Sequence, residues 1–433
     1  MTPFHYRDNQ LFCEDTPLHE IVTQVGTPVY VYSKTEIRRR ASAYLDAASL
    51  AGSKARILAG YAIKANGNPA LIRTIVECGL GADVTSGGEL FLARHAGAPP
   101  QEIIFSGVGK TRLEIEMALD AGIRALHVES EMELAALADI AAARRQVARI
   151  GVRVNPNINA ETHPYISTGL HAHKFGVPRV QAVTLLRQAA AHPWLEPVGL
   201  AAHIGSQITD LQPFVESAQF LAALAEELAD QGIRLTYIDV GGGLGINYTK
   251  AQNLAYDNRE MPPSPVPAIQ EWVTAVSRPI IEAGYEMLME PGRSIVGPAG
   301  ILLTQIVYTK KQGEKQFVIV DAGMNDLIRP TLYQAYHPIV PVCRSAEGSH
   351  LTSVNIVGPV CESGDFLAKE RPFPQVKPGD LLAVLQAGAY GFAMSSNYNG
   401  RLRAAEVLVN KDQFQVIRRR QQYEHLLDGC SPH

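Results

Sequence analysis

The chain has 433 residues, a length that predicts two domains rather than one. Hydrophobic residues make up 46%, charged residues make up 19% and the net charge is −4, which is typical of a water-soluble globular protein. The basic runs at 38–40 and 418–420 are too short for a nucleic-acid footprint, and no apolar run is long enough to span a membrane.

The N-terminal residues 1–11 are polar and lack the apolar core of a secretory signal. The five cysteines are an odd number, and none has the spacing of metal ligands, so we expect neither a disulfide framework nor a metal site. Such a chain fits a reducing, cytoplasmic environment.

The predicted elements begin with a strand at 28–32 and a helix at 34–50. Strand-like and helix-like segments then alternate, with helical periodicity at 111–121, 131–143 and 214–230, for example. The eight strand-like runs are 57–61, 81–85, 103–107, 125–129, 150–155, 198–203, 235–240 and 286–290. Eight alternations predict an α/β fold, a closed (β/α)₈ barrel of the TIM type, over residues 34–293.

After residue 294 the pattern changes to short apolar runs separated by Gly and Pro. This predicts a second, mostly β domain, sandwich-like or barrel-like, made of residues 294–433 together with 1–33. Its predicted strands are 301–308, 317–320, 353–357, 381–385 and 406–409. Two long connections, 157–177 and 244–267, are candidate lids or substrate-contacting loops, although the second could equally be a passive surface excursion.

The apolar run 57–63 ends at Lys64 and passes directly into the turn sequence Asn-Gly-Asn-Pro. Burial lowers the proton affinity of an amine, and a neutral amine is a nucleophile, although an ordinary lysine would fit this segment alone. In a barrel, catalytic groups gather where the strands end. The polar residues at the eight predicted strand ends are Lys64, Asp83, Ser106, Glu129, Arg153, His203, Asp239 and Glu290.

A glycine-rich turn, 241–245, follows the seventh predicted strand, at the place where barrels often bind phosphate. Its spacing matches neither the dinucleotide fingerprint nor the Walker loop. A lysine together with a phosphate cradle suggests pyridoxal phosphate, bound as a Schiff base. His203 offers a planar ring that can stack on the face of the cofactor ring, and Glu290 offers a carboxylate for the pyridine nitrogen of the cofactor. The guanidinium of Arg293 can form two parallel hydrogen bonds with a phosphate or a carboxylate.

Seven blocks of sequence, in order between about residues 20 and 410, resemble the diaminopimelate decarboxylases, which are fold-type III, alanine racemase-like enzymes that use pyridoxal 5'-phosphate. The blocks are Tyr61–Asn66, Ser86–Leu90, His163–Gly169 with Lys174–Gly176, His203–Gln207, Glu290–Arg293, Asp321–Pro330 and Gly358–Asp365. The resemblance implies decarboxylation of meso-2,6-diaminoheptanedioate to L-lysine and carbon dioxide, the last step of lysine biosynthesis.

The resemblance also implies roles for individual residues. Lys64 would hold the cofactor, His203 would stack on its ring, Glu290 would pair with its pyridine nitrogen and Cys361 would protonate the product. The cofactor site would comprise Lys64, Asp83, Arg153, His203, Ser206, Gly241, Gly242, Gly243, Glu290, Pro291, Gly292, Arg293 and Tyr390. The substrate contacts would be Arg293, Arg329, Tyr333, Glu362 and Tyr390. In the family, the counterparts of Cys361 and Glu362 reach the site from the other subunit, which implies a homodimer.

Charge matching supports this substrate, because two arginines suit a distal carboxylate and Glu362 suits a distal ammonium. The alternatives keep the cofactor and change the substrate to ornithine, arginine, carboxynorspermidine or a tethered amino acid. A racemase on the same barrel would need a second acid–base group on the opposite face. A homologue that only binds partners is disfavoured by the presence of Lys64, His203, Glu290 and Cys361 together.

Overall fold

The computed structural model describes residues 2–51, 57–158, 174–249, 266–344 and 350–431. They form two compact units, which we call the barrel unit and the β unit. The described residues of the barrel unit fall within Arg38–Ile246 and Pro265–Ser294. Those of the β unit fall within Met1–Ile37, Asn247–Ser264 and Ile295–His433.

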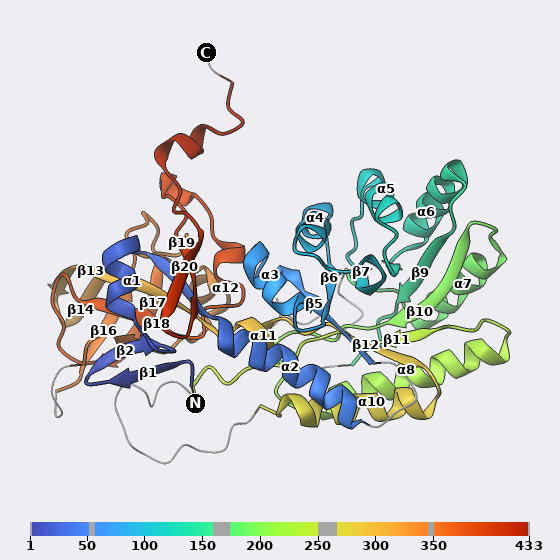
Figure 1. Ribbon diagram of the computed structural model, residues 1–433, viewed down its shortest axis with the longest axis horizontal. Helices are drawn as coiled ribbons and strands as arrows, with labels where there is room; N and C mark the ends of the chain where they lie inside the picture. Colours follow the sequence, from blue (N-terminus) through green and yellow to red (C-terminus); the bar gives the residue numbers. More distant parts are fainter. Residues whose placement is uncertain (1, 52–56, 159–173, 250–265, 345–349, 432–433) are drawn as a thin grey trace. The chain divides into compact units, whose positions relative to one another are not determined.

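The barrel unit is built on eight parallel strands that close into a barrel (Figure 1), which confirms the predicted fold class. Around the barrel the strand order is β10-β11-β12-β5-β6-β7-β8-β9. The strands are β5 (Ile57–Ala62), β6 (Gly81–Val84), β7 (Ile103–Phe105), β8 (Ala125–Val128), β9 (Ala148–Arg153), β10 (Leu195–Ala201), β11 (Tyr237–Asp239) and β12 (Glu286–Met289). Each lies where the sequence predicts a strand, with ends that differ by a few residues.

Helices surround these strands on the outside of the barrel (Figure 1). Because both faces of each strand are covered, β6, β7 and β8 are buried at every position instead of alternating. Thr111 and Glu114 form a capping box at the start of α5, and Gly122 ends that helix in a left-handed conformation. The helices are α2 (Lys34–Leu50), α3 (Pro69–Val76), α4 (Gly87–His95), α5 (Arg112–Ala121), α6 (Glu131–Arg144), α7 (Arg179–Ala191), α8 (Gln212–Asp230) and α10 (Ile269–Glu282).

The β unit contains a nine-stranded sheet whose main path runs β17-β16-β14-β13-β4-β19-β20, with β18 pairing β13 and β15. Strand β4 (Val29–Ser33) is central, because it pairs antiparallel with β13 and parallel with β19. The other members are β13 (Gly300–Gln312), β14 (Lys315–Val320), β15 (Ile339–Pro341), β16 (Thr352–Val357), β17 (Phe366–Phe373), β18 (Leu381–Val384), β19 (Ala405–Asn410) and β20 (Gln413–Arg418). A three-stranded sheet, β1 (Phe4–Arg7), β2 (Gln10–Cys13) and β3 (Thr16–Pro17), precedes helix α1 (Leu18–Val25).

The predicted strands of the second domain are found as β4, β13, β14, β16, β18 and β19. Strands β1, β2, β3, β15, β17 and β20 were not predicted. β3 and β15 are only two and three residues long and each ends in Pro, and β20 has no buried position, so these segments do not show a strand pattern. β17 carries the charged residues Lys369 and Glu370 on exposed positions and Arg371 on a half-buried one, which hides its strand pattern.

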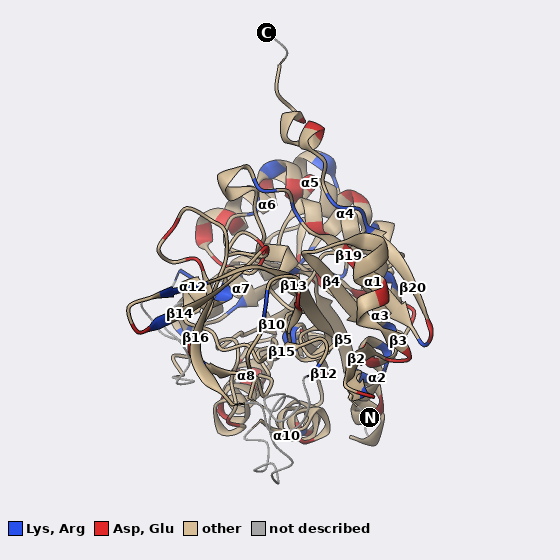
Figure 2. Cartoon of the chain, turned by 90° about the vertical axis from the view of Figure 1, so that its left-hand side faces the viewer, with Lys and Arg blue, Asp and Glu red and all other residues tan. Residues whose placement is uncertain are grey.

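No helix in the described ranges is long and apolar enough to cross a membrane. Helices α4, α5 and α6 each carry both acidic and basic residues (Figure 2).

Candidate active site

Lys64 lies in a single 3₁₀ turn, Ile63–Ala65, that directly follows strand β5. Its Nζ donates to Asp83 Oδ2 of the neighbouring strand β6 at 2.7 Å, and the Asp83 side chain is 1% exposed whereas that of Lys64 is 32% exposed. The amine therefore faces an open space while its partner is buried. Asn68 caps the helix that follows by accepting from Ala70 N, which fixes where the turn ends.

Glu129, directly after β8, forms hydrogen bonds with three other segments at the carboxyl ends of the barrel strands, which we call the barrel rim. Its Oε1 accepts from Gly107 N at 3.0 Å and from Arg153 Nη1 at 3.1 Å, and its Oε2 accepts from Gly176 N at 2.9 Å. The Arg153 guanidinium also lies over the Phe175 ring, 5.0 Å from the centroid. Glu129 thus orients Arg153 and anchors the rim loops that follow β7 and β9.

His203 follows β10, and its Nδ1 accepts from Gly242 N at 3.2 Å. This leaves Nε2 as the protonated ring nitrogen of the neutral imidazole. Burial lowers the pKa of His203 well below its usual value, and the positive charges of Lys64 and Arg153 act in the same direction. The ring is therefore neutral at physiological pH, which suits a stacking partner for another aromatic ring.

The glycine-rich turn after β11 has no room for side chains. A Cβ on Gly241, Gly242 or Gly243 would lie 2.5, 2.1 or 2.2 Å from the carbonyl oxygens of Ala202, Glu290 and Gly205, respectively. Gly241 and Gly243 also have positive φ angles of 69° and 106°. The amide of Gly241 donates to Asp239 Oδ1 at 2.8 Å, so part of this turn is used for internal bonding.

Glu290 follows β12 and is 8% exposed, and its backbone amide donates to Gly241 O at 2.8 Å. Burial is the main cause that raises its pKa well above the usual value, and the charges of Asp83 and Asp239 add to it. Arg293, 7% exposed, begins helix α11 (Arg293–Val296), and its Nη2 donates to Ser206 Oγ at 2.9 Å. Gly292 lies against Ala62 and Ala65, which brings this turn close to the segment of Lys64.

A cavity of about 430 Å³ lies at this end of the barrel. Lys64, Ser106, His127, Arg153, His203 and Glu290 are among its lining residues. Cavities of a few hundred Å³ with a few polar groups are typical small-molecule sites. The structure thus brings the predicted lysine, imidazole and carboxylate to one cavity.

Arg329 belongs to the β unit, where it begins helix α12 (Arg329–Tyr333) and is 4% exposed. His337 Nδ1 lies 2.9 Å from Leu385 O and must donate to it, so Nε2 accepts from Arg329 Nη1 at 2.6 Å. The guanidinium also lies over the ring of Tyr248, 4.7 Å from the centroid. Sequence reasoning missed His337 and Tyr248, because no motif marks either residue as a partner of Arg329.

Cys361 and Glu362, also in the β unit, lie exposed on the loop between β16 and β17. Asp365 shapes this loop, because its Oδ2 accepts from Val360 N at 2.7 Å and its Oδ1 accepts from Met324 N at 2.6 Å. The amide of Cys361 donates to Asn399 Oδ1 at 2.7 Å, so Asn399 is a further residue that sequence reasoning missed.

The predicted site residues therefore fall into two groups. The barrel unit holds Lys64, Asp83, Arg153, His203, Ser206, Gly241, Gly242, Gly243, Glu290, Pro291, Gly292 and Arg293. The β unit holds Arg329, Tyr333, Cys361, Glu362 and Tyr390, the last with a positive φ of 56°. The block 163–169 and most of the connection 244–267 lie outside the described residues.

Comparison with known proteins defines the class first. Residues 34–297 match the family model described as pyridoxal-dependent decarboxylase, pyridoxal binding domain. With its closed barrel and lysine-containing cavity, the chain is a member of the pyridoxal-dependent decarboxylases.

Full-length relatives narrow the class. Diaminopimelate decarboxylase from Aquifex aeolicus is 46% identical over 98% of this chain and 96% of its own length. The Pseudomonas aeruginosa enzyme of the same name is 44% identical over 100% of this chain and 99% of its own. The crystal structure of diaminopimelate decarboxylase from Helicobacter pylori complexed with L-lysine is 40% identical, with a TM-score of 0.87 over 95% of this chain and 98% of that one. The chain belongs to the diaminopimelate decarboxylase family.

Proposed function

We propose that this protein uses pyridoxal 5'-phosphate to decarboxylate meso-2,6-diaminoheptanedioate to L-lysine and carbon dioxide, as the final step of lysine biosynthesis. The observation that carries the proposal is the cavity on which Lys64, His203 and Glu290 converge. The relatives that carry the name diaminopimelate decarboxylase support the choice of substrate.

The residues around the cavity fit this cofactor. Its aldehyde requires an amine, its flat ring requires a planar neighbour, and its pyridine nitrogen requires a carboxylate, which correspond to Lys64, His203 and Glu290. The crowded glycine turn 241–243 provides the close backbone approach that a phosphate needs, with Ser206, Arg293 and Tyr390 as further phosphate ligands. When bound, the cofactor supplies an electron sink for the bond that breaks at Cα.

Arg329 and Glu362 are proposed to hold the distal end of the substrate, which bears a second amino acid group. The buried guanidinium is held by His337 and Tyr248 and offers its fork to a carboxylate. Glu362 suits the distal ammonium, with Tyr333 and Tyr390 as further contacts. At the reacting end, the residues should avoid a strong ion pair with the α-carboxylate, because that pair would stabilise the ground state more than the transition state.

Cys361 is proposed as the acid that returns a proton to Cα after carbon dioxide leaves. Its thiol is solvent-exposed within one chain, on a loop that Asp365 and Asn399 hold in place. We infer that Cys361 and Glu362 enter the site of the other subunit of a homodimer. The proposed setting is cytoplasmic, with no nucleic-acid or membrane partner.

The substrate is tested by measuring carbon dioxide release from meso-diaminopimelate, the L,L isomer, lysine and ornithine in parallel. We expect the kcat/KM for the meso compound to be at least about a hundredfold higher than for the other three compounds. Only the meso compound satisfies both the distal carboxylate and the distal ammonium contacts. Preference for ornithine or lysine would reject the substrate and leave the cofactor chemistry standing.

The shared site is tested by mixing two inactive variants, Lys64→Ala and Cys361→Ala. If each site combines Lys64 of one subunit with Cys361 of the other, a mixed dimer has one intact site, and activity should return to about a quarter of the wild-type value after full exchange. Each variant alone is the control. Persistent inactivity of the exchanged mixture would show that both residues of a site come from one chain.

A further inference from the structure

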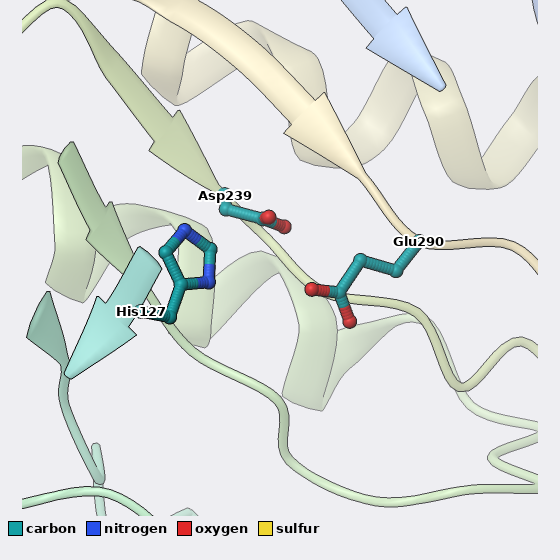
Figure 3. A group of neighbouring side chains, drawn as sticks. All are labelled: His127, Asp239 and Glu290. Carbon is teal, nitrogen blue, oxygen red and sulfur yellow. The ribbon is translucent and has the colours of Figure 1, made fainter. Parts of the chain in front are cut away.

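Beneath Glu290, the interior of the barrel holds two more buried titratable side chains. His127 comes from β8 and Asp239 from the end of β11, and both point toward Glu290 (Figure 3). A ring nitrogen of His127 and one carboxylate oxygen from each acid lie within 4.8 Å of one another. His127 and Asp239 are both 0% exposed. None of the sequence motifs assigns a role to His127, and the proposed reaction uses neither residue.

His127 belongs to a hydrogen-bonded chain that ends on Glu290. Its Nε2 lies 2.9 Å from the hydroxyl of Tyr237, and its Nδ1 lies 3.2 Å from Ser106 Oγ. Ser106 Oγ in turn donates to Glu290 Oε1 at 3.5 Å. Burial lowers the pKa of His127 to about 3, so the ring is neutral and has one donor and one acceptor nitrogen.

An ionised Glu290 sets the direction of every hydrogen bond in the chain, because a carboxylate can only accept from Ser106. Since Ser106 has a single hydroxyl proton and gives it to Glu290, His127 Nδ1–H donates to Ser106. His127 Nε2 must then accept from the hydroxyl of Tyr237, whose pKa burial raises well above its usual value. The chain therefore delivers a donor to Glu290 and favours its carboxylate form.

Asp239 approaches Glu290 from the other side. Its Oδ1 accepts from Gly241 N at 2.8 Å, whereas its Oδ2 is buried without a hydrogen-bond partner among the described residues. A buried carboxylate oxygen beside a second carboxylate is unfavourable unless a proton lies between them. Burial raises the pKa of both acids, that of Glu290 well above its usual value and that of Asp239 to about 7, with a hydrogen bond to Glu290 opposing the rise at Asp239. The two acids are thus arranged to share one proton.

We propose that Asp239 and the chain Tyr237–His127–Ser106 are positioning residues that keep Glu290 anionic and oriented toward the pyridine nitrogen of the cofactor. Once the positive pyridine nitrogen lies against Glu290, it favours ionisation of Glu290 over Asp239, so the single proton of the acid pair moves to Asp239 Oδ2, which donates it to Glu290, while Ser106 donates to Glu290 Oε1. Glu290 then has two donors inside the protein and keeps its negative charge for the pyridine ring. This inference rests on the proposed function, because it takes that nitrogen as the partner of Glu290.

Charged groups from the surrounding strands also act on this assembly. Asp83 and Lys64 act on both acids, and Arg153 acts on Glu290 and His127. Lys110 acts on His127, and Arg124 and Arg149 act on Tyr237. These groups are unchanged in the variants below, so comparing variants at one pH isolates the contribution of the substituted side chain.

The test measures the protonation of the pyridine nitrogen directly, from its ¹⁵N chemical shift in labelled pyridoxal phosphate bound to the protein without substrate. Asp239→Asn keeps an acceptor for Gly241 N and a donor toward Glu290, so it imitates the protonated acid. Its ¹⁵N shift should match that of the wild type between about pH 6 and pH 9. Asp239→Leu removes both groups and should move the shift toward that of an unprotonated pyridine.

Ser106→Ala provides a second arm if Asp239→Leu does not fold. It should move the ¹⁵N shift in the same direction, with kcat lowered about tenfold and KM changed less than about threefold, and Ser106→Thr should restore both. Asp326→Asn, which replaces a buried acid of the β unit, is the control for loss of a buried carboxyl group.

The outcomes separate the inference from the proposed function. If Asp239→Asn displaces the ¹⁵N shift as much as Asp239→Leu does, Asp239 acts as an anion and the inference is wrong. If none of the variants moves the shift, the residues have only a structural role and the inference is again wrong. If the wild-type protein binds no labelled pyridoxal phosphate, the proposed function is wrong, and the inference that rests on it is wrong as well.

Discussion

Lys64 Nζ and Asp83 Oδ2, from neighbouring strands of the barrel, lie 2.7 Å apart in an ion pair whose acid is buried and whose amine borders the cavity. The carboxylate favours the protonated amine, whereas attachment of an aldehyde needs the neutral amine. The pair therefore opposes formation of the neutral, reactive amine.

Replacing Asp83 with Asn should speed the attachment of pyridoxal phosphate to Lys64 at neutral pH, because the anion that favours the charged amine is removed. Attachment is measured on the cofactor-free protein by borohydride fixation followed by mass spectrometry of the Lys64 peptide. Asp120→Asn, which removes the acid of an ion pair with Arg144 in which both partners are partly exposed, is the control. An unchanged rate of attachment would contradict the interpretation of the pair.

Gly242→Ala should destabilise the barrel unit, because the new Cβ would lie 2.1 Å from Glu290 O, a backbone atom that cannot easily move. We expect a loss of about 2–3 kcal/mol, or roughly 5–10 °C in melting temperature, together with weaker binding of pyridoxal phosphate. Gly88→Ala is the matched control, since a Cβ there meets only Ser86 Oγ at 3.7 Å, at the start of α4. Equal melting temperatures for the two variants would rule out the crowding.

His337→Leu should raise the KM for meso-diaminopimelate about tenfold while kcat changes less than about threefold, because Arg329 loses the acceptor that orients its guanidinium. Arg329→Lys should raise the KM further, since an ammonium lacks the bidentate fork. Steady-state kinetics measure both effects. The exposed His19 of the same unit provides a control as His19→Leu. A fall in kcat without a change in KM would show that Arg329 does not bind the distal carboxylate.

Asp326→Asn should change how stability depends on pH. Burial raises the pKa of Asp326 to about 7, whereas an unfolded aspartate titrates near pH 4, so the folded wild type holds the proton more tightly. Its contribution to stability is complete below about pH 4 and is lost as the pH rises to about 7. Relative to the Asn variant, the wild type should therefore lose about 1 kcal/mol per pH unit in this range and remain level above it.

The measurement is urea unfolding of the wild type and the Asn variant in parallel, from about pH 4 to pH 8. Buried histidines, such as His127 with its pKa lowered to about 3, act in the opposite direction below about pH 6.5, but they are common to both proteins and cancel in the difference. A difference in unfolding free energy that is independent of pH would mean that Asp326 is ionised in the folded state.

The barrel could be predicted from the sequence because its strands are continuous apolar runs, each followed by a polar residue. Lys64, His203 and Glu290 could be predicted for the same reason, since the topology of a barrel alone gathers its strand ends. The second domain was harder to predict. Strands such as β20 (Gln413–Arg418) bury little surface, so their pairing partners, and not their own pattern, define them.

The supporting residues could not be predicted. Each of the three residues His127, His337 and Asn399 forms a hydrogen bond with a residue of another segment of the chain. Their roles depend on the orientation of the side chain, that is, on which ring nitrogen or amide oxygen forms the hydrogen bond. Composition and periodicity do not encode this orientation. A lone histidine in an apolar strand, such as His127 in β8, is usually only a packed core residue, so its link to Glu290 emerges only from the structure.

The central place of β4 in its sheet has a consequence for synthesis on the ribosome. Both of its neighbours, β13 and β19, are translated only after the last residue of the barrel, so the nascent segment Val29–Ser33 waits without partners while the barrel emerges complete. Every residue of this segment is buried in the finished sheet. During translation it is an apolar, unpaired segment that is prone to aggregate. A chaperone that binds it until the C-terminal residues are synthesised would raise the yield of folded protein.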